Sequence, residues 1–80
     1  MSPNYFEGRV GPYEFRFYAA DRGEPPHVHI YHDRAEAKIW LENPPRLERS
    51  SLNPKDLKKA TRVVEENLDY MVSVWHDFFD

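Results

Sequence analysis

The sequence predicts an α+β domain in two layers, with an antiparallel strand meander packed on one long C-terminal helix. Two observations predict this fold. Residues 13–41 contain three segments in which apolar and polar side chains alternate, and residues 54–79 repeat apolar side chains at steps of three and four. A chain of 80 residues has room for one hydrophobic core, so we expect a single domain over residues 1–80.

The meander is expected to contain three or four strands. The three clear segments are Tyr13–Tyr18, His27–Tyr31 and Ala35–Leu41. Alternate side chains point to opposite faces of a strand, so the apolar positions of these segments can share one face. Residues 1–12 have a weaker pattern, and a short additional strand turning at Gly11-Pro12 is one interpretation. Asn43-Pro44-Pro45 ends the third segment because proline cannot donate to a ladder, so residues 42–53 are expected to form a proline-containing loop.

The helix is predicted from its start signal and its apolar period. Asn53 suits the N-cap, Pro54 suits the first helical position, and Asp56 suits the positive end of the helix dipole. The apolar positions that follow share one helix face: Leu57, Ala60, Val64, Leu68, Met71, Trp75 and Phe78. We therefore expect one helix over residues 54–79.

Composition narrows the class of protein. The chain has no cysteine, which excludes disulfides and thiolate zinc sites. A net charge of −3 argues mildly against a dedicated nucleic-acid binder, although nucleic acid stays a possible partner. No apolar run has the length of a membrane span and no signal-peptide pattern opens the chain, so we expect a cytoplasmic protein with no membrane partner.

One helix covers only one face of a sheet, so the opposite face is the candidate binding surface. Its expected members are polar, basic and aromatic side chains of the three strands: Arg16, Tyr18, His27, His29, Tyr31, Lys38 and Trp40. Tyrosine, tryptophan and arginine are enriched in the cores of protein interfaces. We therefore expect a protein partner, or a second copy of the chain in a homodimer, on this face.

Two kinds of chemistry are also open to the segment Pro25–Tyr31. Two histidines separated by one residue on a strand can ligate zinc, and His32, Glu14 or Glu36 is the available third ligand. Zinc needs three or four convergent ligands, and we expect no metal and no cofactor.

Acid–base catalysis is the other chemistry. A metal-independent ribonuclease needs a base, an acid and a cation, and His27, His29 and Tyr31 with Arg16 or Lys38 contain all three. We expect a binding protein rather than an enzyme, with the ribonuclease as the alternative.

Three separated motifs resemble a known family. Pro25-Pro26-His27-Val28-His29, then Glu36–Leu41, then Val64–Asn67 with Trp75-His76-Asp77-Phe78-Phe79, resemble the uncharacterised bacterial family called domain of unknown function 4160. The resemblance covers roughly residues 12–80. It implies a short protein often encoded beside another small gene, as in toxin–antitoxin pairs. On this basis we expect a protein-binding component of a two-protein module, with the neighbouring gene product as partner and a ribonuclease toxin as the alternative.

Overall fold

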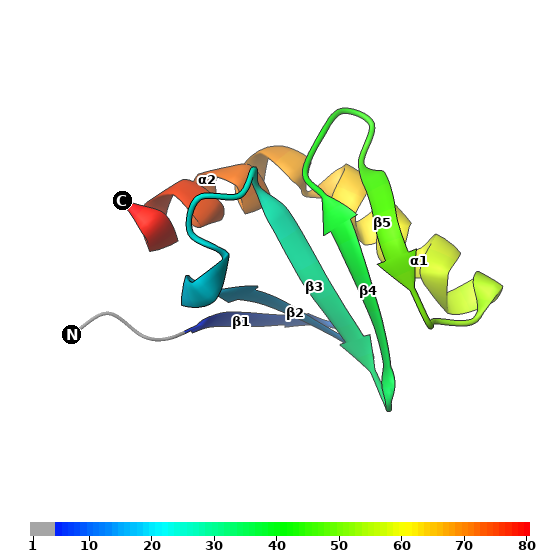
Figure 1. Cartoon of the computed structure of the whole chain (residues 1–80). Helices are drawn as coiled ribbons and strands as arrows, with labels where there is room; N and C mark the ends of the chain where they lie inside the picture. Colours follow the sequence, from blue (N-terminus) through cyan, green and yellow to red (C-terminus); the bar gives the residue numbers. More distant parts are fainter. Residues whose placement is uncertain (1–4) are drawn as a thin grey trace.

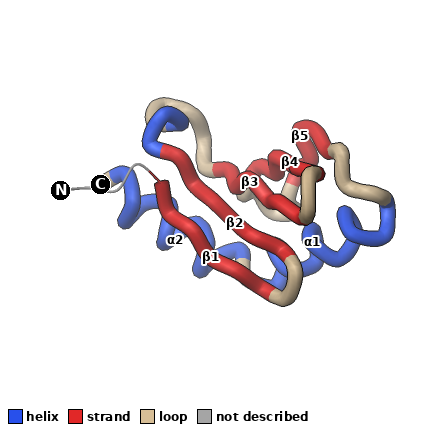
Figure 2. The backbone as a smooth tube through the Cα atoms, turned by 90° about the horizontal axis from the view of Figure 1, so that it is seen from below, coloured by secondary structure: helices blue, strands red, loops and turns tan. Residues whose placement is uncertain are grey.

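The computed structural model describes residues 5–80 and has an α+β fold: an antiparallel five-stranded sheet with two helices at the C-terminal end of the chain (Figure 1). The elements in chain order are β1 (Tyr5–Val10), β2 (Tyr13–Tyr18), the 3-10 helix η1 (Ala19–Asp21), β3 (His27–His32), β4 (Ala35–Trp40), β5 (Arg46–Ser50), α1 (Pro54–Glu66) and α2 (Leu68–Phe79). The strands lie in the order β1-β2-β3-β4-β5, a simple meander. Both helices lie on one side of the sheet, and in Figure 2 the strands β1 and β2 lie in front of α2.

The core lies between the helices and one face of the sheet, as the alternation predicts. Phe15 of β2 is opposite Ile30 of β3, and Ile30 is opposite Ala37 of β4, so these side chains share the helix-facing side. From the helices, α1 buries Ala60 and Val64. The complete buried apolar set is Tyr13, Phe15, Phe17, Val28, Ile30, Ala37, Ile39, Leu41, Leu52, Ala60, Val64, Met71 and Trp75.

The first hairpin confirms the turn expected at Gly11-Pro12. β1 pairs with β2 along its whole length, from Tyr5 opposite Tyr18 to Val10 opposite Tyr13. Gly11 has φ of 57°, a left-handed conformation that glycine adopts without a steric penalty at the first position of a two-residue hairpin turn. Residues 1–4 of the expected 1–12 start lie outside the described residues.

The expected loop over residues 42–53 is partly wrong, because Arg46–Ser50 forms the fifth strand, β5. This edge strand pairs with β4, and the register shifts between Lys38 and Ile39. Four of its five side chains are exposed, including Leu47, so no face of the strand carries an apolar pattern. Its backbone pairing therefore leaves no trace in hydrophobic periodicity.

The expected single helix is also wrong, because it is divided at Asn67 into α1 and α2. Asn67 has φ −123° and ψ 21°, and its side-chain Nδ2 donates a 2.8 Å hydrogen bond to the carbonyl of Val63. Asparagine competes for backbone hydrogen bonds in this way, which favours helix ends over helix interiors. The buried positions Val64 and Met71 lie on both sides of the break, so the apolar period does not reveal it. Neither helix in the described part of the chain is long and apolar enough to cross a membrane.

Candidate metal centre

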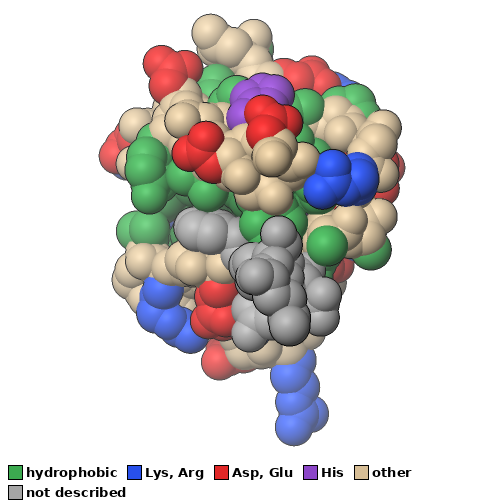
Figure 3. Space-filling view, turned by 90° about the vertical axis from the view of Figure 1, so that its left-hand side faces the viewer, with side chains coloured by type: hydrophobic (Ala, Val, Ile, Leu, Met, Phe, Trp, Pro, Cys, Tyr) green, Lys and Arg blue, Asp and Glu red, His purple; other side chains and the backbone are tan. Residues whose placement is uncertain are grey.

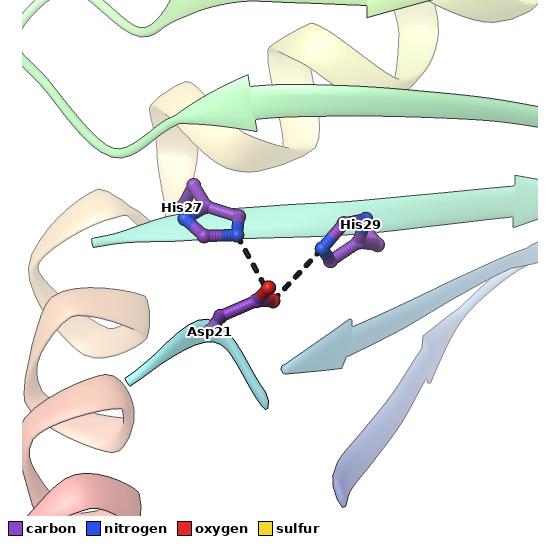
Figure 4. Close-up of side chains that lie close together, drawn as sticks. All are labelled: Asp21, His27 and His29. Carbon is purple, nitrogen blue, oxygen red and sulfur yellow. Dashed lines mark hydrogen bonds and ion pairs between the residues drawn. The ribbon is translucent and has the colours of Figure 1, made fainter. Parts of the chain in front are cut away.

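Asp21, His27 and His29 form a compact group at the start of β3, which we call the His–Asp cluster (Figure 4). The double proline at residues 25–26 leads the chain into β3, where His27 and His29 project from the same face because they are two residues apart. Asp21 is the last residue of η1, which directly follows β2. The cluster therefore joins a loop to a sheet strand.

The two histidines are buried, in contrast to the expected placement on an open face. His27 is fully buried and His29 is only 7% exposed. The rings of Trp40 and Trp75 lie 5.2 and 5.1 Å from the His27 ring, and the ring of Tyr18 lies 5.0 Å from that of His29. Neighbouring aromatic rings, together with Asp21, thus cover the imidazoles that the sheet pattern alone would leave in water.

The cluster brings three ligand atoms together. Asp21 Oδ2 lies 3.0 Å from His27 Nε2 and 3.0 Å from His29 Nε2, and all three atoms lie within 4.8 Å of one another. For a tetrahedral ion with bonds of about 2.0–2.1 Å, neighbouring ligand atoms are roughly 3.3 Å apart. The two separations from Asp21 Oδ2, both 3.0 Å, differ from this value by a few tenths of an ångström.

The other ring nitrogens have partners that fix their orientation. His27 Nδ1 lies 3.0 Å from the carbonyl oxygen of Pro25, which can only accept, so Nδ1 carries the proton. His29 Nδ1 lies 3.3 Å from Glu36 Oε2. Metal-ligating histidines almost always donate their second N–H to a carbonyl or a carboxylate in this manner. Both rings can therefore present an Nε2 lone pair to the centre of the cluster.

His27 Nε2 is the unusual atom of the site. It is buried and has no hydrogen-bond partner among residues 5–80. Asp21 Oδ2 lies 3.0 Å away, but the two atoms do not have hydrogen-bond geometry. A buried polar atom without a partner costs about 1–3 kcal/mol. Such an atom in a native structure points to an ion, a water or another ligand that binds there.

The loop that carries Asp21 is anchored to the end of α2. Arg22 Nη1 donates a 2.8 Å hydrogen bond to the carbonyl of Phe79, and its guanidinium lies 5.3 Å from the centre of the Phe79 ring. Figure 3 shows acidic and hydrophobic side chains intermixed at this end of the molecule. Residues 63–80 contain no lysine or arginine, so Arg22 supplies a cation to the negative end of the helix dipole.

The remaining members of the expected binding face have polar partners, either one another or neighbouring glutamates. The Tyr18 and Tyr31 hydroxyls are 2.7 Å apart, and Tyr31 also donates to Glu36 at 3.2 Å. Burial, followed by the hydrogen bond to Tyr18, raises the pKa of Tyr31. Further contacts of this face are Arg16 to Glu14 (2.9 Å), Lys38 to Glu24 (3.1 Å) and Trp40 to Glu48 (2.9 Å).

The three residues expected as a third metal ligand do not complete the cluster. His32 lies at the other end of β3, where its ring contacts Tyr13. Glu14 pairs with arginines, and the hydrogen bond from Arg16 is among the contacts that lower its pKa, after the hydrogen bond with Glu7. Glu36 touches the outer nitrogen of His29. Sequence reasoning missed Asp21 because its position depends on how η1 follows β2.

The geometry of the cluster suits acid–base catalysis on RNA less well than it suits a metal ion. Both Nε2 atoms face Asp21, and neither imidazole is open to a large substrate. Tyr31 shares the face, yet its hydroxyl is occupied by Tyr18 and Glu36. A general base must reach the proton it abstracts, and these contacts restrict that reach.

Comparison with known proteins gives one relationship. The chain matches the family described as a domain of unknown function (DUF4160) over residues 13–76, which include the His–Asp cluster. No curated protein and no solved structure matches it.

Proposed function

Because the chain belongs to the DUF4160 family, whose function is not known, we propose a function from the site itself: the protein binds one divalent transition-metal ion at the His–Asp cluster. The observation that carries this proposal is the buried His27 Nε2, which has no hydrogen-bond partner among the described residues and faces the cluster. Its other nitrogen is committed to Pro25, so a cation is the natural partner for the free lone pair.

Counting donors supports a metal ion over neutral histidines alone. His29 has a carboxylate oxygen at each ring nitrogen, Asp21 at 3.0 Å and Glu36 at 3.3 Å, but a neutral imidazole has only one N–H. With an ion in the cluster, Nδ1–H donates to Glu36 while Nε2 and Asp21 Oδ2 become ligands. The same ion uses the lone pair of His27 Nε2, so all four ring nitrogens and Asp21 Oδ2 then have a partner.

The local charge also favours a cation. The three carboxylates beside the two rings, Asp21, Glu24 and Glu36, outnumber the nearby cations, because Lys38 pairs with Glu24 and Arg49 pairs with Glu36. Nitrogen and carboxylate ligands suit zinc and other first-row divalent ions. Three protein ligands leave a further position for water or a substrate atom, as in catalytic zinc sites rather than closed structural ones.

The test is a zinc titration of the chelator-treated chain by calorimetry, with metal content measured after dialysis. We expect one zinc ion per chain, and Asp21→Asn should weaken binding at least about tenfold, because an amide oxygen is a poorer ligand than a carboxylate. Asp33→Asn is the matched control: it removes the same charge beside a histidine, but in the β3–β4 turn. Absence of stoichiometric binding, or equal loss in both variants, would refute the proposal.

We propose a second role, protein binding, for the sheet face opposite the helices. The supporting observation is that neither helix covers this face, where Tyr18, Tyr31 and Trp40 stay half-buried (Figure 1). The partner proposed is the product of a neighbouring gene in a toxin–antitoxin-like pair. Co-expression followed by size-exclusion chromatography tests it: Trp40→Ala should weaken the complex, and elution of two separate proteins from the unaltered pair would contradict it.

A further inference from the structure

The outer edge of β1 is the least protected part of the sheet. β1 and β5 are the two edges, because each pairs with a single strand among residues 5–80. β5 follows two prolines, has a register shift beside it and carries charged side chains, all devices that discourage pairing of an edge with another strand. β1 has six residues with no proline and regular pairing to β2. Its outer edge is therefore open to a further strand.

We propose that β1 pairs antiparallel with β1 of a second copy of this chain, joining two sheets into one across a two-fold axis at Gly8. This inference is independent of the metal centre. A two-fold interface uses the same surface of both copies, so the strand must be complementary to itself. The described side chains of β1 meet this requirement through their charges.

Charge selects the register. Val10 and Tyr13 close a two-residue hairpin, so alternation turns the backbone groups of Glu7 and Arg9 toward the free edge. Pairing Glu7 with its own copy, or Arg9 with its own copy, would place like charges opposite each other. The two-fold axis at Gly8 instead places Glu7 opposite Arg9 of the partner, and Arg9 opposite Glu7 of the partner. Opposite charges in directly opposed positions stabilise a sheet, and like charges destabilise it.

The charged row continues into both sheets. Glu7 is opposite Arg16, and Arg9 is opposite Glu14, with 3.8 Å between the charged atoms of each pair. Across the proposed junction the charges would therefore alternate: Arg16, Glu7, then the second copy's Arg9 and Glu14. Glu7 also lies beside Glu14, and this contact raises the pKa of Glu7, so a further cation from the second copy's Arg9 would stabilise its charged form.

The other side of β1 is apolar and recessed. A hollow of about 190 Å³ lies beside Gly8 between the strand and α2. Its base includes the buried Phe15 and Phe17, and its rim includes Val10, 45% exposed, and Tyr70, 67% exposed. Gly8 would lie at the two-fold axis and has no side chain to obstruct the approach. The exposed apolar rim can then be covered by the second copy, which adds burial to the backbone pairing.

The experiment is a mass measurement in solution by light scattering or sedimentation, over chain concentrations up to millimolar. The chain mass is 9.6 kDa, and we expect twice that value. Glu7→Arg and Arg9→Glu should each raise the dimer dissociation constant at least about tenfold, because each places like charges at both ends of the junction. An equimolar mixture of the two variants should recover the dimer. The strand of Glu7→Arg then has two basic residues and that of Arg9→Glu has two acidic ones, so the two strands are complementary to each other but not to themselves.

Arg46→Glu is the matched control, because it makes the same charge change on the opposite edge strand, where Arg46 is 57% exposed. It should leave the dimer intact. Circular dichroism verifies that each variant is folded. A monomer at all concentrations, or a dimer that Arg46→Glu weakens and Arg9→Glu does not, would overturn the proposal. A dimer that forms in the mixture, while each variant by itself stays monomeric, would be specific to this interface.

Discussion

The ring of His27 packs against the indole of Trp75, with their centroids 5.1 Å apart. Trp75 also contacts Phe17 on the helix-facing side of the sheet, at 5.4 Å. One indole thus touches both the hydrophobic core and the His–Asp cluster. A change in the position of the His27 ring would therefore act directly on a side chain of α2.

This contact makes tryptophan fluorescence a reporter of metal binding. The indoles of Trp75 and Trp40 lie 5.1 and 5.2 Å from the His27 ring. A paramagnetic Co²⁺ ion at the cluster should quench both, and the quenching should saturate at one ion per chain. In Asp21→Asn the same Co²⁺ concentration should quench less. Equal quenching in Asp21→Asn and in the unaltered chain would place the ion elsewhere.

Truncation of Trp75 should remove a large part of the stability of the domain. Trp75 is 4% exposed and contacts Phe17, His27 and Phe79. Removing a buried large aromatic side chain costs about 3–5 kcal/mol, out of a total stability of about 5–15 kcal/mol for a typical domain. Urea denaturation of Trp75→Ala should show a greatly lowered midpoint. Tyr70→Ala, on the exposed side of α2, should change it little, and an unchanged midpoint in Trp75→Ala would contradict the observed packing.

The sequence predicts those elements in which one face is buried, because burial of one face makes apolar residues recur at a regular interval along the chain. The segment Tyr13–Tyr18 alternates between buried and half-buried side chains, and it forms a strand of the predicted extent. The apolar side chains of residues 54–79 line one helical side, and the helix begins at Pro54 as its cap predicts. In both cases one face packs against the core, so apolar residues recur with the period of the element, two residues for a strand and about 3.6 for a helix.

The missed features depend on the backbone or on distant parts of the chain. β5 is specified by pairing with β4 and has little buried surface, while the break at Asn67 rests on one asparagine and leaves the apolar face unchanged. The site shows the same limit. The spacing of His27 and His29 predicts that they share a face, but the approach of Asp21 requires η1 to lie beside β3. Hydrophobic patterning carries no information on that loop.

The cap of α1 offers a local test of the helix start. Asn53 Oδ1 accepts a 2.8 Å hydrogen bond from the backbone N–H of Asp56. Replacing an N-cap asparagine by alanine typically costs about 1 kcal/mol, because a helix N–H loses its partner. Asn53→Ala should therefore lower the denaturation midpoint. Asn53→Ser, which keeps an acceptor oxygen, should recover most of the loss, and equal midpoints for the two variants would argue against capping by this side chain.

Alkaline pH should destabilise the fold through two tyrosines. Burial, first among the causes, raises the pKa of both Tyr13 and Tyr31 above the ordinary value of 10.0. Tyr13 donates to Asp56 at 2.9 Å, and Tyr31 lies against Tyr18 and Glu36, so ionisation would set negative charges beside carboxylates or another phenol. The unfolded chain then loses these protons at lower pH than the folded chain does.

The sign of the pH dependence follows from this difference in proton binding. Below the unfolded pKa of about 10 both states hold the protons, and the stabilisation is fully present. As the pH rises above it, the unfolded state binds fewer protons than the native state, so the free energy of unfolding falls. Urea midpoints measured from neutral to alkaline pH should decrease above about pH 10, with a shallower decrease in Tyr31→Phe. Tyr70→Phe, which alters a phenol 67% exposed to solvent, should keep the full decrease. A Tyr31→Phe profile as steep as that of Tyr70→Phe would assign the alkaline loss of stability to groups other than Tyr31.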